Sequence, residues 1–224
     1  IIDFSIGILL SKSIFQSYRK TLLLVSILFN VGFLGFFKYY NFFIENFINV
    51  FTFFGNPIEV GSLKIILPVG ISFYTFQTLS YTIDVYRKKI EPTKNFLSFA
   101  AFVCFFPQLV AGPIERASVF LIQFSSFKSF NYRQALSGMK LVLWGFFKKV
   151  VVADTCAIFS DQIFNNSSDL NGSTLLLGAF YFSIQIYGDF SGYSDIAIGV
   201  SKLFGFELKS NFKNPYFSRD IAEF

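Results

Sequence analysis

Residues 173–200 read STLLLGAFYFSIQIYGDFSGYSDIAIGV, an apolar run that continues into a segment with two aspartates. The run 173–187 is free of charged residues, and Asp189 and Asp195 follow it closely. A carboxylate close to hydrocarbon costs at least a few kcal/mol, so it persists where it faces a polar interior or a water-filled path. This stretch therefore predicts a membrane protein with a functional polar interior.

The composition of the whole chain agrees with a membrane protein. Hydrophobic residues make up 53% of the 224 residues, aromatic residues 21% and charged residues 15%; the mean hydropathy is +0.54. Soluble domains carry roughly 25% charged residues, and a soluble fold of this size could not cover so much apolar surface. Because lipid excludes open sheet edges, we predict an all-α fold, a polytopic transmembrane helical bundle.

Segments that cross a membrane need about 20 mostly apolar residues. The candidates are residues 1–10, 21–37, 63–86, 96–110, 135–152, and 173–187 with its continuation to 206. Basic clusters lie on the cytoplasmic side of membrane proteins, which predicts that 21–37 runs outward and that 63–86 returns. This path leaves an outside loop at 154–172, and it also leaves Lys148 and Lys149 near the outer surface, against the rule. The expected location is the cell (inner, cytoplasmic) membrane, with several passes.

The fourth candidate ends in residues 106–113, FPQLVAGP, which contain two prolines and a glycine. These residues would leave backbone groups unpaired in lipid. We therefore expect a re-entrant or broken helical segment shielded by protein, in place of a full crossing. Its marker residues are Pro107, Gln108, Gly112, Pro113 and Arg116.

The third candidate carries polar residues at i, i+3, i+7 and i+10, which form one stripe on a helix. They are Tyr74, Gln77, Tyr81 and Asp84. One interpretation is the wall of a hydrophilic tunnel. The alternative is a hydrogen-bonded seam between helices that ends in an Asp84–Lys88 ion pair.

Two interpretations also remain open for the aspartates of the opening stretch. On a helix Asp195 shares a face with Ser191, and the glycines of the motif 188–192 let a neighbouring helix approach closely. The functional interpretation is a polar centre that positions a substrate hydroxyl or orients a catalytic base. The structural interpretation is that Asp195 is held by Lys202 or by an arginine elsewhere.

Several kinds of site have no counterpart in the sequence. The chain contains no histidine, and it has no P-loop, no GxSxG motif and no spacing typical of metal ligands. We predict no metal and no bound cofactor. Nucleic acid is not an expected partner, because the net charge of +5 follows from the positive-inside pattern. The two cysteines, Cys104 and Cys156, are expected to be buried thiols.

Five blocks together resemble the membrane-bound O-acyltransferase family, in particular the branch of the alginate O-acetyltransferase membrane subunit. The blocks are residues 67–87, FFPQLVAGPIER at 105–116, GFFKKVVVAD at 145–154, DFSGYSDIAIG at 189–199 and NPYFSRDIAEF at 214–224. The match covers residues 63–224. It implies a polytopic enzyme with a tunnel through the membrane, into which an acyl donor such as acetyl-CoA or an acyl-carrier protein enters from the cytoplasmic side.

The resemblance also implies an acceptor and a set of site residues. The acyl group would pass to an extracytoplasmic or cell-surface polysaccharide, directly or through a partner acyltransferase, as in alginate acetylation or teichoic-acid D-alanylation. The family's catalytic histidine follows a Glu-Phe pair that corresponds here to Glu223 and Phe224, so we expect it just beyond Phe224. The residues expected to shape the chamber or the histidine loop are Asp189, Ser191, Tyr193, Asp195, Asn214, Pro215, Tyr216 and Glu223.

The alternative function is a transporter or flippase of lipid-linked substrates, which the composition and the polar stripes fit equally well. The five blocks favour the enzyme. We read the chain as an internal fragment of one transmembrane acyltransferase domain, residues 1–224. Without a histidine as general base, this piece alone is predicted to be inactive.

Overall fold

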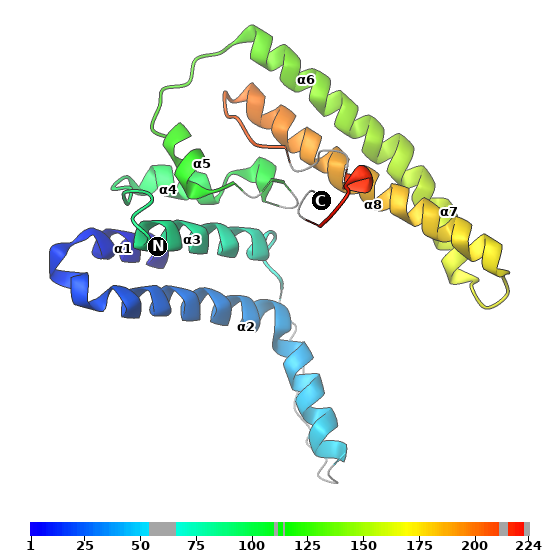
Figure 1. Cartoon of the computed structure of the whole chain (residues 1–224), viewed down its shortest axis with the longest axis horizontal. Coiled ribbons are helices and arrows are strands. Elements are labelled where there is room, and N and C mark those ends of the chain that lie inside the picture. The colour runs from blue at the N-terminus through cyan, green and yellow to red at the C-terminus, as the bar shows by residue number, and fades with distance from the viewer. Residues whose placement is uncertain (54–65, 110–111, 114, 211–214, 222–224) are drawn as a thin grey trace. The chain divides into compact units, whose positions relative to one another are not determined.

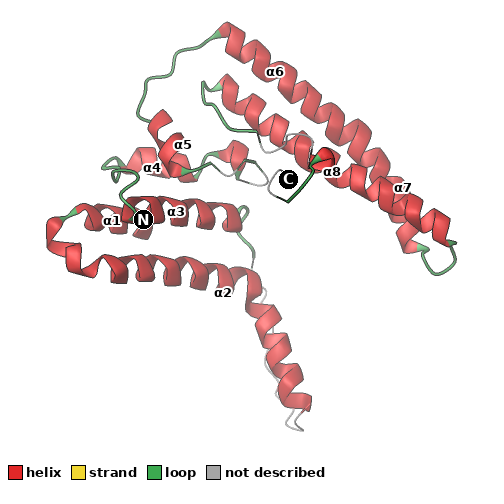
Figure 2. Cartoon of the chain, in the orientation of Figure 1, coloured by secondary structure: helices red, strands yellow, loops and turns green. Residues whose placement is uncertain are grey.

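A computed structural model describes residues 1–53, 66–109, 112–113, 115–210 and 215–221. These residues form helices and connecting loops and contain no strand (Figure 2), which confirms the all-α prediction. The chain divides into two compact units: Ile1–Phe105 with Arg116–Ser125, and Phe106–Glu115 with Ser126–Phe224. Among the described helical stretches, Ile14–Phe53 is the one long and apolar enough to cross a membrane by length and composition.

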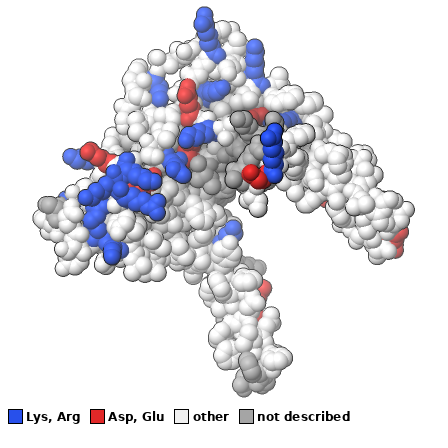
Figure 3. All heavy atoms as spheres, in the orientation of Figure 1, with Lys and Arg blue, Asp and Glu red and all other residues white. Residues whose placement is uncertain are grey.

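Unit 1 is built around three helices that pack side by side, as Figure 1 shows. Its elements are α1 (Ile2–Ser11), the 3-10 helix η1 (Ser13–Tyr18), α2 (Arg19–Phe53), α3 (Ile71–Tyr86), α4 (Phe96–Val103) and α5 (Ala117–Gln123). Lys and Arg side chains gather where α1 ends and α2 begins (Figure 3). There the Arg19 guanidinium donates to the carbonyl oxygens of Leu10 and Tyr86, each at 2.5 Å, and so joins the ends of α1 and α3.

A buried carboxylate joins the three packed helices. Asp3 on α1 is 6% exposed and accepts hydrogen bonds from Ser26 Oγ at 2.5 Å, from Asn30 Nδ2 at 3.0 and 2.9 Å and from Thr82 Oγ1 at 3.2 Å. Ser26 and Asn30 lie on α2 and Thr82 on α3, so each helix contributes. A buried acid whose lone pairs are satisfied in this way stabilises one mutual register of the helices.

Replacing Asp3 should therefore weaken unit 1. We expect Asp3→Ala to lower the free energy of unfolding by about 2 kcal/mol, because it leaves buried hydroxyl and amide donors without an acceptor. Thermal unfolding in detergent measures the effect. Asp161→Ala, at an exposed position on α7, is the control and should change stability by less than about 0.5 kcal/mol. Equal stability of the two variants would contradict the structural role of Asp3.

Two expected spans of unit 1 have different bounds in the structure. α2 does not end near residue 37 but continues to Phe53, because neither proline nor glycine interrupts it after Gly35. α3 begins at Ile71, later than expected, because Pro68 and Gly70 (φ 76°) start the helix there. Residues 63–65 lie outside the described part of the chain.

The predicted break in the fourth apolar segment is confirmed. α4 has 8 residues, about 12 Å of helix, well short of the roughly 30 Å of a hydrocarbon core. The chain then leaves helical geometry at residue 104 and forms only a short 3-10 turn, η2 (Phe106–Gln108). Whether the segment re-enters a membrane stays a prediction.

Unit 2 is a helical hairpin with additional turns. Its elements are α6 (Tyr132–Phe146), the π-helix η3 (Phe147–Ala153), α7 (Asp154–Asn165), α8 (Gly172–Leu203) and the 3-10 turn η4 (Pro215–Phe217). Most of the connection expected as a loop at 154–172 is helical: α7 occupies residues 154–165, because no proline or glycine interrupts the helical rod after Phe146. Its place outside the membrane stays a prediction. The turn comes only after Asn165.

Glycines set the contact between α6 and α8. A Cβ added at Gly145 would lie 2.6 Å from the carbonyl oxygen of Gly192, and one added at Gly138 would lie 2.6 Å from that of Gly199. The two glycine pairs are seven residues apart on each of the two antiparallel helices. The backbones of α6 and α8 therefore approach closely along one line of contact, which we call the glycine seam. The same seam continues where Gly188 meets Ala153.

Candidate functional site

The two aspartates of α8 are both paired with lysines of the π-helix η3. Lys148 Nζ lies 2.5 Å from Asp195 Oδ2, and Lys149 Nζ lies 2.6 Å from Asp189 Oδ1. The structural interpretation, in which Lys202 or an arginine holds Asp195, is wrong about the partner: Lys148 holds Asp195, and Lys202 Nζ is directed instead to Ser137 Oγ at 3.3 Å. The lysines that disagreed with the positive-inside rule are therefore the counter-ions of these two aspartates.

The glycine seam explains how adjacent lysines reach different acids. Asp189 and Asp195 stand three residues before and three residues after Gly192 on α8. A Cβ at Gly192 would lie 3.2 Å from the backbone nitrogen of Lys149 and 3.4 Å from Lys148 Cβ. Because both lysines pack against Gly192, their side chains extend to opposite sides of it: Lys148 toward Asp195 and Lys149 toward Asp189. Single π turns recur at functional sites, and this one carries both cations.

The two ion pairs differ in their exposure. The side chains of Lys148 and Asp195 are 14% and 21% exposed, so this pair lies in the helix interface. The side chains of Lys149 and Asp189 are 44% and 37% exposed, and Lys149 also contacts Asp154 Oδ1 at 2.7 Å. The first pair therefore belongs to the packing of the hairpin, whereas the second is accessible to a ligand.

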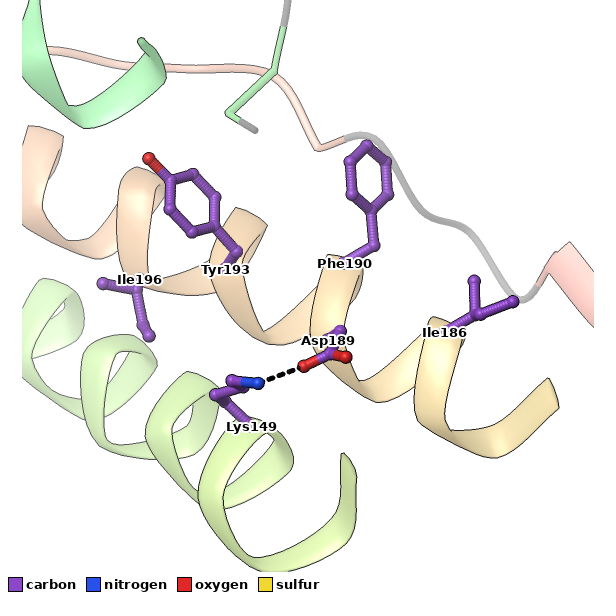
Figure 4. Close-up of a pocket in the computed structure, with 6 residues that line it drawn as sticks. All are labelled: Lys149, Ile186, Asp189, Phe190, Tyr193 and Ile196. Atoms are coloured by element: carbon purple, nitrogen blue, oxygen red, sulfur yellow. Dashed lines mark hydrogen bonds and ion pairs between the residues drawn. The ribbon is translucent and has the colours of Figure 1, made fainter. Parts of the chain in front are cut away.

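A cavity of about 430 Å³ opens beside the accessible pair. It is lined by Lys149, Ile186, Asp189, Phe190, Tyr193 and Ile196. In Figure 4 the Lys149 and Asp189 side chains point toward one another from neighbouring helices, beside the apolar and aromatic side chains of α8. The lining is thus apolar apart from one ion pair and one phenol, and the volume lies in the usual range of small-molecule sites.

Tyr193 connects this cavity with the broken segment. Its hydroxyl donates to the carbonyl oxygen of Pro107 at 3.4 Å. A second hollow of about 140 Å³ is lined by Phe106, Pro107, Tyr193, Ile196, Ala197 and Val200. Tyr193 and Ile196 line both spaces, so the break after α4 brings Pro107 to the face of α8 that carries the candidate site.

The other expected chamber residues have different positions. Ser191 is buried, 2% exposed, and Asp195 is not among the residues that line the larger cavity. Tyr216 in η4 donates from its hydroxyl to the carbonyl oxygen of Ser183 at 2.5 Å, and its ring lies 5.8 Å from that of Tyr187. Pro215 begins the same turn. Asn214 and Glu223 lie outside the described residues.

The polar stripe of α3 takes part in contacts within unit 1. Gln77 Nε2 donates to the carbonyl oxygen of Phe102 at 2.9 Å, and the buried ring of Tyr81 lies 4.9 Å from that of Phe99. Asp84 is buried and Tyr74 half-buried. The Asp84–Lys88 ion pair considered above does not form between these two described residues. The contacts are those of an interhelical seam, and a role as tunnel wall stays a prediction.

Within the broken segment, Pro107, Gln108, Gly112 and Pro113 are buried and Arg116 is exposed at the start of α5. Sequence reasoning missed Glu115, which is 3% exposed and accepts the backbone N–H of Lys209. It also missed the roles of Asp3, Lys148 and Lys149. The sequence contained two signals for these roles. Asp3 is an acid inside the apolar run 1–10, and the predicted membrane path placed Lys148 and Lys149 on the wrong side.

Both cysteines differ from expectation. Cys104 is exposed and Cys156 is half-buried, so the prediction of buried thiols is wrong. Cys104 follows the last turn of α4, where the helix breaks, and its side chain leaves the packed face. Among the described residues, no group of three or more His, Cys, Asp or Glu side chains could hold a metal ion.

The chain is similar to several bacterial acyltransferases. It is 41% identical to the probable alginate O-acetylase AlgI of Pseudomonas putida over 203 residues, which are 90% of this chain and 41% of that protein. It is 35% identical to a peptidoglycan O-acetyltransferase of Helicobacter pylori over an alignment of 235 positions, which covers 93% of this chain and 44% of the relative. It is 30% identical to a teichoic acid D-alanyltransferase of Streptococcus thermophilus over 182 residues, 75% of this chain and 42% of the relative.

These similarities extend over most of the chain. The chain belongs to the membrane-bound O-acyltransferase family. No protein-family model matches it. The chain spans less than half the length of the relatives described above. Because these members of the family are named as transferases, they favour the acyltransferase hypothesis over the transporter or flippase.

Proposed function

We propose that this chain is part of a multi-pass enzyme of the cytoplasmic membrane that transfers an acyl group, specifically acetyl, to hydroxyls of an exported or cell-surface polysaccharide. Relatives named for alginate, peptidoglycan and teichoic acid support a cell-envelope polymer as acceptor. The higher identity to the alginate O-acetylases, 41% against 30% for the D-alanyltransferase, supports acetyl transfer of the alginate type.

The observation that carries this proposal is the cavity beside Lys149 and Asp189. A space of about 430 Å³ with apolar walls and one ion pair has room for a short acyl group with a polar carbonyl end together with part of its carrier. A bound acyl group would displace water from these walls, which would limit the competition of water with the acceptor hydroxyl for the acyl group. Lys149 would direct an N–H toward a carbonyl oxygen that gains negative charge in the transition state.

The reaction would join the acceptor oxygen to the acyl carbon and break the bond between that carbon and the sulfur of a thioester donor. The hydroxyl proton must pass to a base and then to the departing thiolate. The resemblance assigns the base to a histidine expected after Phe224. In this chain the apolar residues of the cavity would then hold the acyl group. The ion pair between Lys149 and Asp189 would keep these two side chains oriented toward the cavity.

The partners follow from this chemistry. The donor would be a thioester, acetyl-CoA or an acyl-carrier protein, on the cytoplasmic side, and the acceptor would be the polymer or an extracytoplasmic acyltransferase that completes the transfer. Membrane lipid would surround the helices. The cavity needs no bound cofactor for this reaction, since the acyl donor is itself a substrate.

Paired variants in the complete protein test the role of the cavity. Lys149 contacts two acids at similar distances, Asp189 at 2.6 Å and Asp154 at 2.7 Å, but only Asp189 lines the cavity. We expect Asp189→Asn to lower polymer acylation at least about tenfold, the effect of about 1.4 kcal/mol on the transition state. Asp154→Asn, which removes the same charge outside the cavity, should keep most of the activity. Polymer-bound acetyl measured by NMR is the readout.

Membrane insertion of both variants must match that of the unmodified protein. If Asp189→Asn acylates the polymer at the unmodified rate, the cavity is not the acyl site. If both variants lose activity equally, the effect comes from Lys149 losing a partner and not from the cavity. If the complete, correctly inserted protein acylates no hydroxyl at all from any thioester, the proposed function itself is wrong.

A further inference from the structure

The helix α2 consists of two parts with different surroundings. Its 35 residues correspond to about 52 Å of helix, far more than the roughly 30 Å of a hydrocarbon core. The first part packs against α1 and α3, and Lys38 Nζ reaches Ser72 Oγ near the start of α3, at 3.5 Å. α2 changes direction partway along and leaves the three-helix packing (Figure 1). We call residues 38–53 the α2 arm.

The α2 arm is amphipathic, whereas the preceding part of α2 is apolar almost all round. At about 100° per residue, one half of the arm's circumference is entirely apolar and aromatic. That face consists of Tyr39, Tyr40, Phe43, Ile44, Phe47, Ile48, Val50 and Phe51. The opposite face contains the polar residues Lys38, Asn41, Glu45, Asn46, Asn49 and Thr52, with Phe42 and Phe53 among them. Most of the apolar face is exposed: Phe43 is 61% and Phe47 49% exposed, whereas Tyr40, Ile44 and Ile48 are half-buried.

The end of the packed helices α1, α2 and α3 that lies away from the α2 arm has the features of a membrane surface. The ends of α1 and α3 meet at Arg19, and basic residues surround this place. They are Lys12, Arg19, Lys20, Arg87, Lys88 and Lys89. From Arg19 to Lys38 the helix rises roughly 28 Å, which matches the thickness of a hydrocarbon core. The α2 arm therefore begins where the second surface lies.

We propose that the α2 arm lies along the membrane surface opposite the basic end of unit 1, with its apolar face in the lipid. This inference rests on the membrane placement in the proposed function. Amphipathic helices bind at the boundary between headgroups and acyl chains through the apolar face, and tyrosines are typical of that layer. By the positive-inside rule this is the outer surface, where the polysaccharide acceptor would be.

The other placements conflict with the pattern of residues. A continued crossing would put Glu45, Asn46 and Asn49 into hydrocarbon on one face, and charged groups there cost at least a few kcal/mol each. A rod projecting into water would expose a row of aromatic side chains larger than soluble surfaces usually carry. The surface position satisfies both faces.

Depth measurements on single-cysteine variants test the proposal in the complete protein, with Cys104 and Cys156 and any other cysteine replaced. Fluorophores are attached at position 43 or 47 on the apolar face and at 45 or 49 on the polar face, in vesicles of phosphatidylethanolamine and phosphatidylglycerol. Positions 43 and 47 should be quenched at least about twofold more by brominated lipids than positions 45 and 49, as expected for an interfacial helix. An impermeant aqueous quencher should show the reverse.

Each other pattern overturns the proposal. Protection of all four positions from the aqueous quencher, with strong lipid quenching, means that the arm crosses the bilayer. Aqueous quenching of all four means that it projects into water. Positions 43 and 47 protected from both quenchers are covered by protein, either the rest of the molecule or a second copy. The readout does not involve acyl transfer, so a wrong enzymatic assignment leaves the result interpretable.

Discussion

Lys148→Met is expected to destabilise unit 2 by about 3 kcal/mol, the lower end of the cost of removing one partner from a buried ion pair, because this pair is largely but not fully buried. Lys148 and Asp195 are 2.5 Å apart, and their side chains are 14% and 21% exposed. Without the lysine, the Asp195 carboxylate would remain in the helix interface with its charge uncompensated. Unfolding in detergent, followed by circular dichroism, measures the loss.

Two further variants separate the ion pair from other effects. Lys149→Met breaks a pair whose side chains are 44% and 37% exposed, and water can solvate the remaining acid, so we expect a loss below about 1 kcal/mol. The double variant Lys148→Met with Asp195→Leu removes both charges and should recover most of the stability, because apolar side chains can replace a buried pair. Equal losses for the two single variants, or no recovery in the double variant, would contradict this account.

The fold class and the break after α4 were predictable because they follow from local rules. Lipid requires internally paired backbones, which excludes open sheets, and Pro107 with Gly112 cannot continue a helix. The extension of α2 to Phe53 and the helix α7 were missed for a related reason. Both continue helices across polar residues, and a search for apolar spans ends at the first polar group.

The candidate site was predictable only in part. Asp189 and Asp195 could be singled out, since acids next to an apolar run are unusual, and Tyr193 lines both cavities. The lysine partners could not be assigned, because 40 residues separate Lys149 from Asp189 and the rotation of one helix against another depends on tertiary packing. The glycine seam determines that rotation. The predicted membrane path placed Lys148 and Lys149 near the outer surface, against the positive-inside rule. This conflict was the sequence signal that the two lysines pair with acids elsewhere in the chain.

Gly145→Leu is expected to disrupt the hairpin of α6 and α8, with a loss of about 3 kcal/mol or more. A Cβ at this position would lie 2.6 Å from the carbonyl oxygen of Gly192 and 2.7 Å from Ile196 Cγ1. The carbonyl is backbone and cannot rotate away, so α8 would have to move off α6. That movement would separate Lys148 from Asp195 and remove the wall of the cavity that Ile196 provides. Melting temperature and the yield of folded protein in detergent measure the effect.

The matched control is Gly32→Leu on α2, where an added Cβ meets nothing within 4 Å. Leucine is the better helix former by about 0.5–1 kcal/mol, so this variant should be neutral or slightly stabilising. The two substitutions are chemically identical and differ only in the neighbouring helix. A loss of stability common to both would mean that leucine is harmful at any glycine of this chain. A loss confined to Gly145 would instead assign it to close packing of α6 against α8, the contact that brings both lysines to their aspartates.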